Sequence, residues 1–243
     1  MTSPRRLAIA AGVCYLVTHV TSVAALALYS PALKDAAWIA GHGTDGRVLL
    51  GAFLEVFLAF AVVGTAVALY PVVRRQNEAV ALGYVTLRTL EAGIIVVDIA
   101  ALLAAVTLRR HLAGAAGPDP APWVAAGRAV LALHDWTFML GPSFTSGTNT
   151  VLLAWLMYRA RLVPRFIPVL GLLGGPLVFA SVTGVLFGLY GQYTAVPAVA
   201  ALPEFAWEVC LAVYLIVWGF RPSSSVMRAI AAEPPSGGAE PAT

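Results

Sequence analysis

Residues 48–73 read VLLGAFLEVFLAFAVVGTAVALYPVV, an apolar run in which Glu55 is the one charged residue. A run of about 20 apolar residues is long enough to cross the hydrocarbon core of a bilayer as a helix. Backbone N–H and C=O groups without a hydrogen-bond partner are too costly in lipid. A helix pairs these groups within the run itself, so each such run is predicted to be helical. The complete set of runs is Leu7–Tyr29, Val48–Val73, Ala79–Leu108, Ala129–Tyr158, Phe166–Tyr190 and Val196–Phe220. The predicted fold is therefore all-α, an integral membrane bundle of six transmembrane helices.

The composition of the chain agrees with a membrane protein and excludes other classes. Of 243 residues, 60% are hydrophobic and 11% are charged, against about 45–50% and about 25% in soluble domains. So much apolar sequence also excludes a largely disordered chain. The net charge of +3 does not indicate nucleic-acid binding, because the basic residues are scattered in ones and twos between apolar runs. The predicted partner is the lipid bilayer.

The loops between the runs predict the orientation of the chain. The first run is longer than a signal-peptide core and is expected to be retained. With the N-terminus inside, the basic residues of the inner segments are Arg5, Arg6, Arg74, Arg75, Arg159, Arg161, Arg165, Arg221 and Arg228, and those of the outer segments are Lys34, Arg47, Arg109, Arg110 and Arg128. This bias places both termini of a multi-pass plasma-membrane protein in the cytoplasm. Residues 1–221 form the predicted membrane domain, and residues 222–243, rich in Pro, Ser, Gly and Ala, a disordered cytoplasmic tail.

Acidic residues inside the apolar runs are the main functional signal. A charged side chain at the centre of a membrane helix costs about 2.5–3.5 kcal/mol by insertion scales. Several such residues must therefore face one another or a hydrated cavity. The acidic residues in or at the mouth of predicted spans are Glu55, Glu91, Asp98, Asp135, Glu204 and Glu208, and Arg88 is the basic one.

The spacing of these residues predicts that they share a pocket. In the fourth span Asp135, Pro142 and Asn149 are seven residues apart, which places them on one helical face. The third span has a second polar face. Its residues, which follow one another at intervals of four, three and seven positions, are Tyr84, Arg88, Glu91 and Asp98. We expect a pocket in the outer half of the bundle, closed below by Arg88 and Tyr84.

The predicted pocket suits acid–base chemistry on a small apolar, prenyl or lipid-like substrate. Glu55 and Glu208 are the candidate proton donor and acceptor, and Asp98 and Asp135 the candidates that orient a substrate or stabilise a cation. The candidate binding residues are Arg88, Glu91, His19, His134, Asn149, Glu204 and Tyr84. A proton-coupled transporter or exporter and a non-catalytic membrane subunit are the alternatives, and the sequence leaves open whether the protein is an enzyme. It makes no prediction of oligomeric state.

Each of these residues also has a purely structural interpretation. Arg88 and Glu91 are three residues apart and can neutralise each other as an ion pair. His134 and Asp135 can mark an interfacial helix start, His19 can be a hydrogen-bonded packing residue, and Glu204 can be exposed. The histidines are far apart in sequence, so no metal and no other cofactor is predicted. The functional interpretation depends on Glu55, Asp98 and Glu208, which have no basic partner on their own helices.

The order of several short motifs resembles a bacterial family of polytopic membrane proteins known as domain-of-unknown-function family 4386. The motifs are Arg6-Leu7-Ala8, Asp45-Gly46-Arg47, the run from Tyr84 to Glu91, Leu133-His134-Asp135, Tyr158-Arg159 with Leu162-Val163-Pro164-Arg165, Pro203-Glu204 and Trp207-Glu208. The resemblance covers roughly residues 5–221 and implies a multi-span membrane protein with no established reaction. The chain departs from the family at Asp135, because the resemblance implies a less charged residue directly after the histidine.

Overall fold

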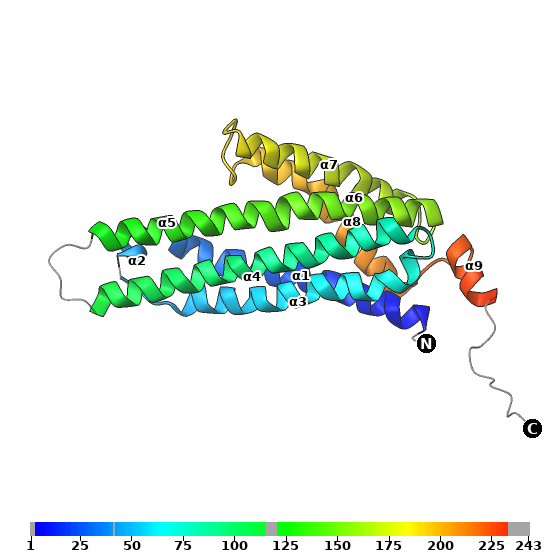
Figure 1. The fold of residues 1–243 in the computed structure, drawn as a ribbon, viewed down its shortest axis with the longest axis horizontal. Helices are drawn as coiled ribbons and strands as arrows, with labels where there is room; N and C mark the ends of the chain where they lie inside the picture. Colours follow the sequence, from blue (N-terminus) through cyan, green and yellow to red (C-terminus); the bar gives the residue numbers. More distant parts are fainter. Residues whose placement is uncertain (1–2, 41, 115–120, 233–243) are drawn as a thin grey trace, which may run out of the picture.

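The computed structural model describes residues 3–40, 42–114 and 121–232, which fold into helices with no strand among them (Figure 1). The all-α prediction is confirmed. In chain order the elements are α1 (Pro4–Leu33), α2 (Ala36–Ile39), α3 (Gly46–Val73), α4 (Glu78–Gly114), α5 (Ala121–Phe138), the π-helix η1 (Met139–Thr145), α6 (Ser146–Ala160), α7 (Phe166–Leu186), α8 (Ala195–Val217) and α9 (Ser225–Ala232).

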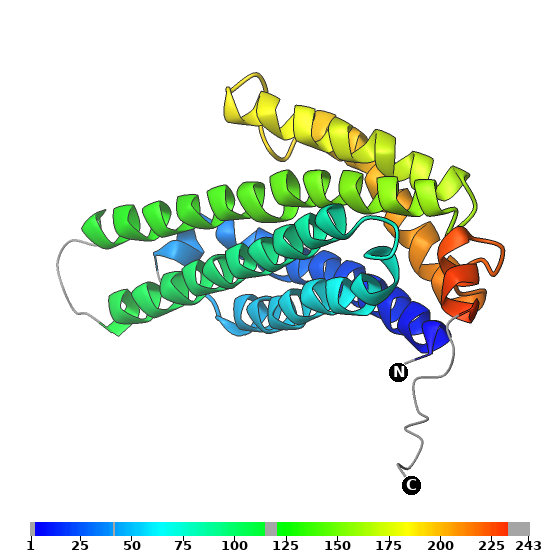
Figure 2. The same cartoon turned by 45° about the vertical axis from the view of Figure 1, so that its right-hand side comes forward.

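Five helices of the described chain, α1, α3, α4, α7 and α8, are long and apolar enough to cross a membrane. The predicted fourth span corresponds to three elements, α5, η1 and α6, which follow one another as one long rod in both views (Figures 1 and 2). The π-helical segment in the middle contains Pro142, which has no backbone N–H to donate. This segment interrupts the α-helical hydrogen bonding after the 18 residues of α5, so the rod is not one regular span.

Several predicted boundaries were wrong. Helix α4 continues to Gly114 and α5 begins at Ala121, so the predicted linker 109–128 is helical at both ends. Helix α7 ends at Leu186 instead of Tyr190. Gly188 there has a φ of 72°, and the Leu189 N–H donates to the Gly184 carbonyl at 2.9 Å. A left-handed glycine with such a hydrogen bond is a common way for a helix to end.

The expected tail, residues 222–243, differs from the prediction in its described part. Residues 225–232 form helix α9, and residues 233–243 lie outside the described chain. Val226 of α9 is 4% exposed, and Met227 and Ile230 pack against the same core cluster as Leu162 and Phe220. Burial of these apolar side chains explains why this segment is ordered on the bundle.

The bundle exposes apolar side chains, as expected of a protein whose solvent is lipid, and buries several charged residues within an otherwise apolar core. Large apolar side chains project outward, including Phe60, which is 74% exposed. Acids and an arginine are buried instead, among them Glu55, Arg88 and Asp98. Extended apolar surface of this kind marks contact with a membrane. The α7–α8 hairpin lies along α6 and α1 at one end of the bundle and diverges from α5 toward the other (Figure 2).

The start of α1 is tied to the end of α8 by Arg5. The Arg5 guanidinium donates to the carbonyls of Leu215 (3.1 Å), Ile216 (2.7 Å) and Val217 (3.2 Å). These are carbonyls of the last helical turn, which lack intrahelical partners and carry the negative end of the helix dipole. Arg5 therefore adds a polar link between α1 and α8, which also pack directly against each other.

Substituting Arg5 by alanine is expected to lower the free energy of unfolding by about 1–2 kcal/mol. The loss comes from three carbonyls that give up a charged donor. Thermal unfolding of the purified protein in detergent measures it. Arg6→Ala is the matched control, because the neighbouring Arg6 side chain is exposed and makes none of these bonds. Equal shifts for both variants would contradict this role of Arg5.

Candidate functional site

A cavity of about 160 Å³ lies inside the bundle where α1, α3, α4 and α8 meet the η1 segment. Six of the predicted site residues line it, from four different helices. They are His19 of α1, Glu55 of α3, Arg88, Glu91 and Asp98 of α4, and Glu208 of α8. Four carboxyl groups thus share the cavity with a single arginine, and no lysine is among the described lining residues.

Arg88 forms the floor of this cavity and bridges two acids. Its Nη1 donates to Glu91 Oε2 at 3.1 Å, and its Nη2 donates to Glu208 Oε1 at 3.1 Å. Asn149 of α6 donates to the same Glu91 oxygen at 2.7 Å. His19 Nε2 lies 3.5 Å from Glu208 Oε2. Arg88 is therefore shared between helices α4 and α8 and does more than neutralise its neighbour Glu91.

Tyrosines pack beneath Arg88 and do not line the cavity. The Tyr84 and Tyr15 hydroxyls are hydrogen bonded at 3.2 Å, and Tyr84 donates to Thr65 at 3.4 Å. The Arg88 guanidinium lies over the Tyr15 ring at 5.1 Å from its centroid, a cation–π contact. Tyr84, predicted to close the pocket from below, is fully buried one layer under Arg88. Thr65 was missed because a threonine in an apolar helix gives no signal of its own.

Hydroxyl donors hold the other two acids of the cavity, Glu55 and Asp98. Tyr29 donates to Glu55 Oε1 at 2.9 Å, while Glu55 Oε2 has no hydrogen-bond partner among the described residues. Thr137 donates to Asp98 at 2.7 Å, and His134 Nε2 lies 3.5 Å from the other Asp98 oxygen. Neither Tyr29 nor Thr137 was predicted. Both stand one or two turns from polar residues of their own helices, which is a signal that sequence reasoning could have used.

Asp135 does not line the cavity, although its Oδ1 lies 3.4 Å from Nδ1 of the buried His134. Its side chain is 49% exposed, and the Tyr193 hydroxyl from the α7–α8 loop donates to it at 3.0 Å. Burial and the Asp135 carboxylate raise the pKa of the Tyr193 phenol, so the hydroxyl keeps its proton and remains a donor. Lys34 lies over the ring of Tyr193 at 5.0 Å. The structure thus places Asp135 at a contact between the hairpin tip and α5.

The π-helical segment explains why Asp135 and Asn149 do not share a face as predicted. A π-helix closes i→i+5 hydrogen bonds and so turns more slowly per residue than an α-helix. The face toward the cavity therefore advances in steps of four, through Phe138, Pro142 and Ser146. The buried His134 begins this face, and Asp135 points outward.

Glu204 lies next to the cavity but does not line it. It is buried, and its Oε1 accepts from Ser146 Oγ at 2.8 Å and from Thr150 Oγ1 at 2.9 Å. Ser146 itself lines the cavity, so the Glu204 carboxyl is separated from the cavity by one hydroxyl group. The interpretation of Glu204 as an exposed residue does not hold.

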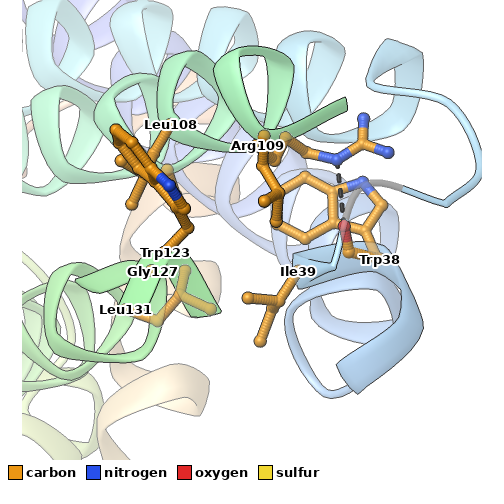
Figure 3. Close-up of a pocket in the computed structure, with 9 residues that line it drawn as sticks. Trp38, Ile39, Leu108, Arg109, Trp123, Gly127 and Leu131 are labelled. Carbon is orange, nitrogen blue, oxygen red and sulfur yellow. Dashed lines mark hydrogen bonds between the residues drawn. The ribbon is translucent and has the colours of Figure 1, made fainter. Parts of the chain in front are cut away.

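A smaller hollow between the C-terminal part of α4 and the N-terminal part of α5 is a packing feature (Figure 3). Its volume is about 10 Å³, close to the minimum that holds one water. Arg109 lies over the Trp38 ring at 4.8 Å, donates to the Trp38 carbonyl at 3.0 Å and pairs with Asp45. Asp45 also pairs with Arg110, so this cluster fastens the 38–45 segment to α4.

Membrane-length apolar helices around a buried cluster of charged residues define this chain as a multi-pass integral membrane protein. It belongs to the family described as Domain of unknown function (DUF4386), whose model matches residues 10–219. The resemblance seen in the sequence is thereby confirmed. Comparisons with curated proteins and with solved structures found no match.

Proposed function

We propose that the protein is a proton-coupled carrier for a small, positively charged solute that binds in the acidic cavity. The observation that carries this proposal is the charge balance of the lining. Glu55, Glu91, Asp98 and Glu208 face one fixed cation, Arg88. Uncompensated carboxylates inside a membrane protein are costly. Protons or a bound cation must supply the missing positive charge, and the two can then compete for the same oxygens.

The size of the cavity favours a small solute over a prenyl chain. Pockets for drug-sized ligands measure about 300–1,000 Å³, and this cavity measures about 160 Å³. A compact cation of a few heavy atoms fits this volume in the observed conformation. We therefore favour a small cationic substrate over the prenyl substrate considered in the sequence analysis.

Two layers of acids give such a solute a defined path. Glu55 and Asp98 form the outer layer, each held by one hydroxyl donor. Glu91 and Glu208 form the inner layer, joined by Arg88. Because Glu55 Oε2 has no described hydrogen-bond partner, it is the oxygen best placed to accept a proton or contact a cation first. A cation that moves inward must then compete with Arg88 for the inner acids.

Glu55→Gln and Glu208→Gln are each expected to abolish cation-driven proton movement. Glutamine keeps the shape of the side chain but has no carboxyl group that can take up and release a proton. Purified protein is placed in liposomes that contain the pH dye pyranine, and tetramethylammonium or guanidinium is added outside. Both cations carry a permanent charge, so a change in internal pH reports exchange for protons. Wild-type protein should exchange the entering cation for internal protons and so alkalinise the lumen.

Glu78→Gln is the control for these variants, because the Glu78 side chain is exposed in the first turn of α4 and does not line the cavity. It should retain exchange, and all variants should elute as folded protein on size exclusion. Wild-type protein that moves no protons with either cation, or a Glu55→Gln variant with unchanged exchange, would contradict the carrier proposal. Amide variants that lower only stability would favour a purely structural subunit.

Acid–base catalysis on a small lipid-soluble molecule is the second candidate. His19, at the edge of the cavity, stacks on Phe205 at 4.9 Å between ring centroids, and the Phe205 side chain is half exposed on the outer surface. This seam between α1 and α8 gives a lipid-soluble substrate a lateral way to the carboxyl groups of Glu55 and Glu208. Turnover of such a substrate would need no ion gradient, which separates it from transport.

We also propose a topology of six spans, with the α5–η1–α6 rod as the fourth. The described start of α1 and helix α9 lie at the same end of the bundle (Figure 1), where most arginines of the chain gather. The positive-inside rule makes this end cytoplasmic in a plasma membrane. Residues 1–221 then form the membrane domain and residues 222–243 a cytoplasmic tail.

A further inference from the structure

Four arginines converge on a second pocket, at the end of the bundle that holds the start of α1 and helix α9. The pocket has a volume of about 390 Å³. Its lining comes from three parts of the chain, the α6–α7 turn, the segment after α8, and α9. The lining residues are Arg161, Arg165, Arg221, Ser223 and Arg228.

None of these four guanidinium groups is paired with a carboxylate of the described chain, and none of their side chains has a described hydrogen bond. Arg165 lies over the Tyr158 ring at 5.3 Å from its centroid, a cation–π contact. Like charges brought together at one pocket repel one another unless an anion lies between them. Guanidinium groups present several N–H donors in a fork that matches the oxygens of a phosphate group.

The backbone of Arg161 is held in a conformation that its residue type disfavours. Arg161 caps α6 with φ 53° and ψ 36°, and it is the one non-glycine residue of the described chain with a positive φ. Glycine or asparagine is usual at such a helix end. Strained positions of this kind are concentrated at functional sites. The strained backbone of an arginine that lines the pocket is therefore a second observation in favour of a functional site here.

The segments that carry the other arginines are fixed in place. The Arg221 N–H donates to the Leu162 carbonyl at 2.8 Å, which joins the segment after α8 to the α6–α7 turn. Ser224 is buried and its hydroxyl caps α9 by accepting the Met227 N–H at 3.1 Å. Val226 then anchors α9 on the core, which holds Arg228 over the pocket. The site is preorganised by contacts that do not involve its ligand.

We propose that this pocket binds the phosphate group of an acidic phospholipid in the membrane leaflet on its side. Free phosphate and a lipid headgroup offer the same oxygens. The position favours the lipid, because the pocket lies where α6 ends and α7 begins, at the level of the headgroups that border those spans. Basic pockets between helix ends are common sites for anionic lipids. This site is independent of the acidic cavity and of any transported solute.

The test measures lipid binding to the full-length protein in detergent by native mass spectrometry. Phosphatidylglycerol and phosphatidylcholine are the lipids added. We expect one phosphatidylglycerol to bind at least about tenfold more tightly than phosphatidylcholine, since one charge-assisted contact is worth about a factor of ten. The double variant Arg161→Gln/Arg228→Gln should lose this preference. The control Arg6→Gln/Arg159→Gln removes the same charge outside the pocket and should keep it.

A second variant guards against loss of folding. Arg161→Gly removes one guanidinium and also relieves the left-handed backbone, so it should raise the melting temperature while weakening phosphatidylglycerol binding about tenfold. Unchanged lipid preference in the double variant, or an equal loss in the control pair, would overturn the proposal. So would inorganic phosphate that displaces phosphatidylglycerol at equal concentration, because the site would then be one for free phosphate.

Discussion

Arg88→Gln is expected to lower the free energy of unfolding by about 3–5 kcal/mol, the usual loss when one partner of a buried ion pair is removed. Arg88 is 2% exposed and donates to Glu91 and Glu208 on two helices. Glutamine leaves both acids buried with their cation gone. It also removes the cation–π contact to Tyr15. The loss is measured as thermal or denaturant unfolding of the purified protein, followed by size exclusion and tryptophan fluorescence.

Removing the acids as well should restore most of this stability. In the triple variant Arg88→Gln/Glu91→Gln/Glu208→Gln no charge of the Arg88 bridge is left without its partner, so its stability should approach that of the wild type. Arg159→Gln is the control for loss of charge alone, because Arg159 lies at an exposed helix end over Trp155. If Arg88→Gln were as stable as the Arg159→Gln control, the Arg88 bridge would contribute nothing to the fold.

The bridge through Arg88 shows what sequence spacing predicts well and what it misses. Residues on one straight helix keep their relative positions, so the shared face of Arg88, Glu91 and Asp98 was predictable from intervals of three and seven. The partner of Glu208 was not, because it lies on another helix 120 positions away. Which helices are neighbours depends on packing of apolar surfaces, and every span of this chain has a similar apolar composition.

The fourth predicted span shows the second limit. Its spacing of seven between Asp135 and Asn149 assumes regular α-helical turns throughout. The π-helical segment Met139–Thr145 breaks that assumption and turns His134 inward in place of Asp135. Pro142 is a visible sign that hydrogen bonding is interrupted there, but proline alone does not tell a kink from a π-helix. Membrane location, helix type and the acidic residues were therefore predictable, and the facing of residues across this break was not.

Close contact between α7 and α8 sets the position of the acids on α8, and it depends on Gly174. A Cβ atom at Gly174 would lie 2.7 Å from the Glu204 Cα and 2.9 Å from the Pro203 carbonyl carbon. Real Cβ contacts are longer, and both obstacles are backbone atoms that no rotamer change can move. Even alanine must therefore push the two helices apart. Since Glu204 and Glu208 are one turn apart on α8, both would shift relative to Arg88.

Gly174→Ala is therefore expected to destabilise the protein by about 3 kcal/mol, the upper part of the range for overpacking, and to reduce proton exchange with it. Gly93→Ala is the matched control, because a Cβ at Gly93 meets no atom within 4 Å. Alanine there should stabilise α4 by up to about 1 kcal/mol through helix propensity. The same substitution should thus have opposite signs at two membrane-helix glycines in parallel unfolding measurements. A Gly174→Ala variant as stable as Gly93→Ala would mean that α7 and α8 are not in backbone contact, and that the position of Glu208 beside Arg88 has another cause.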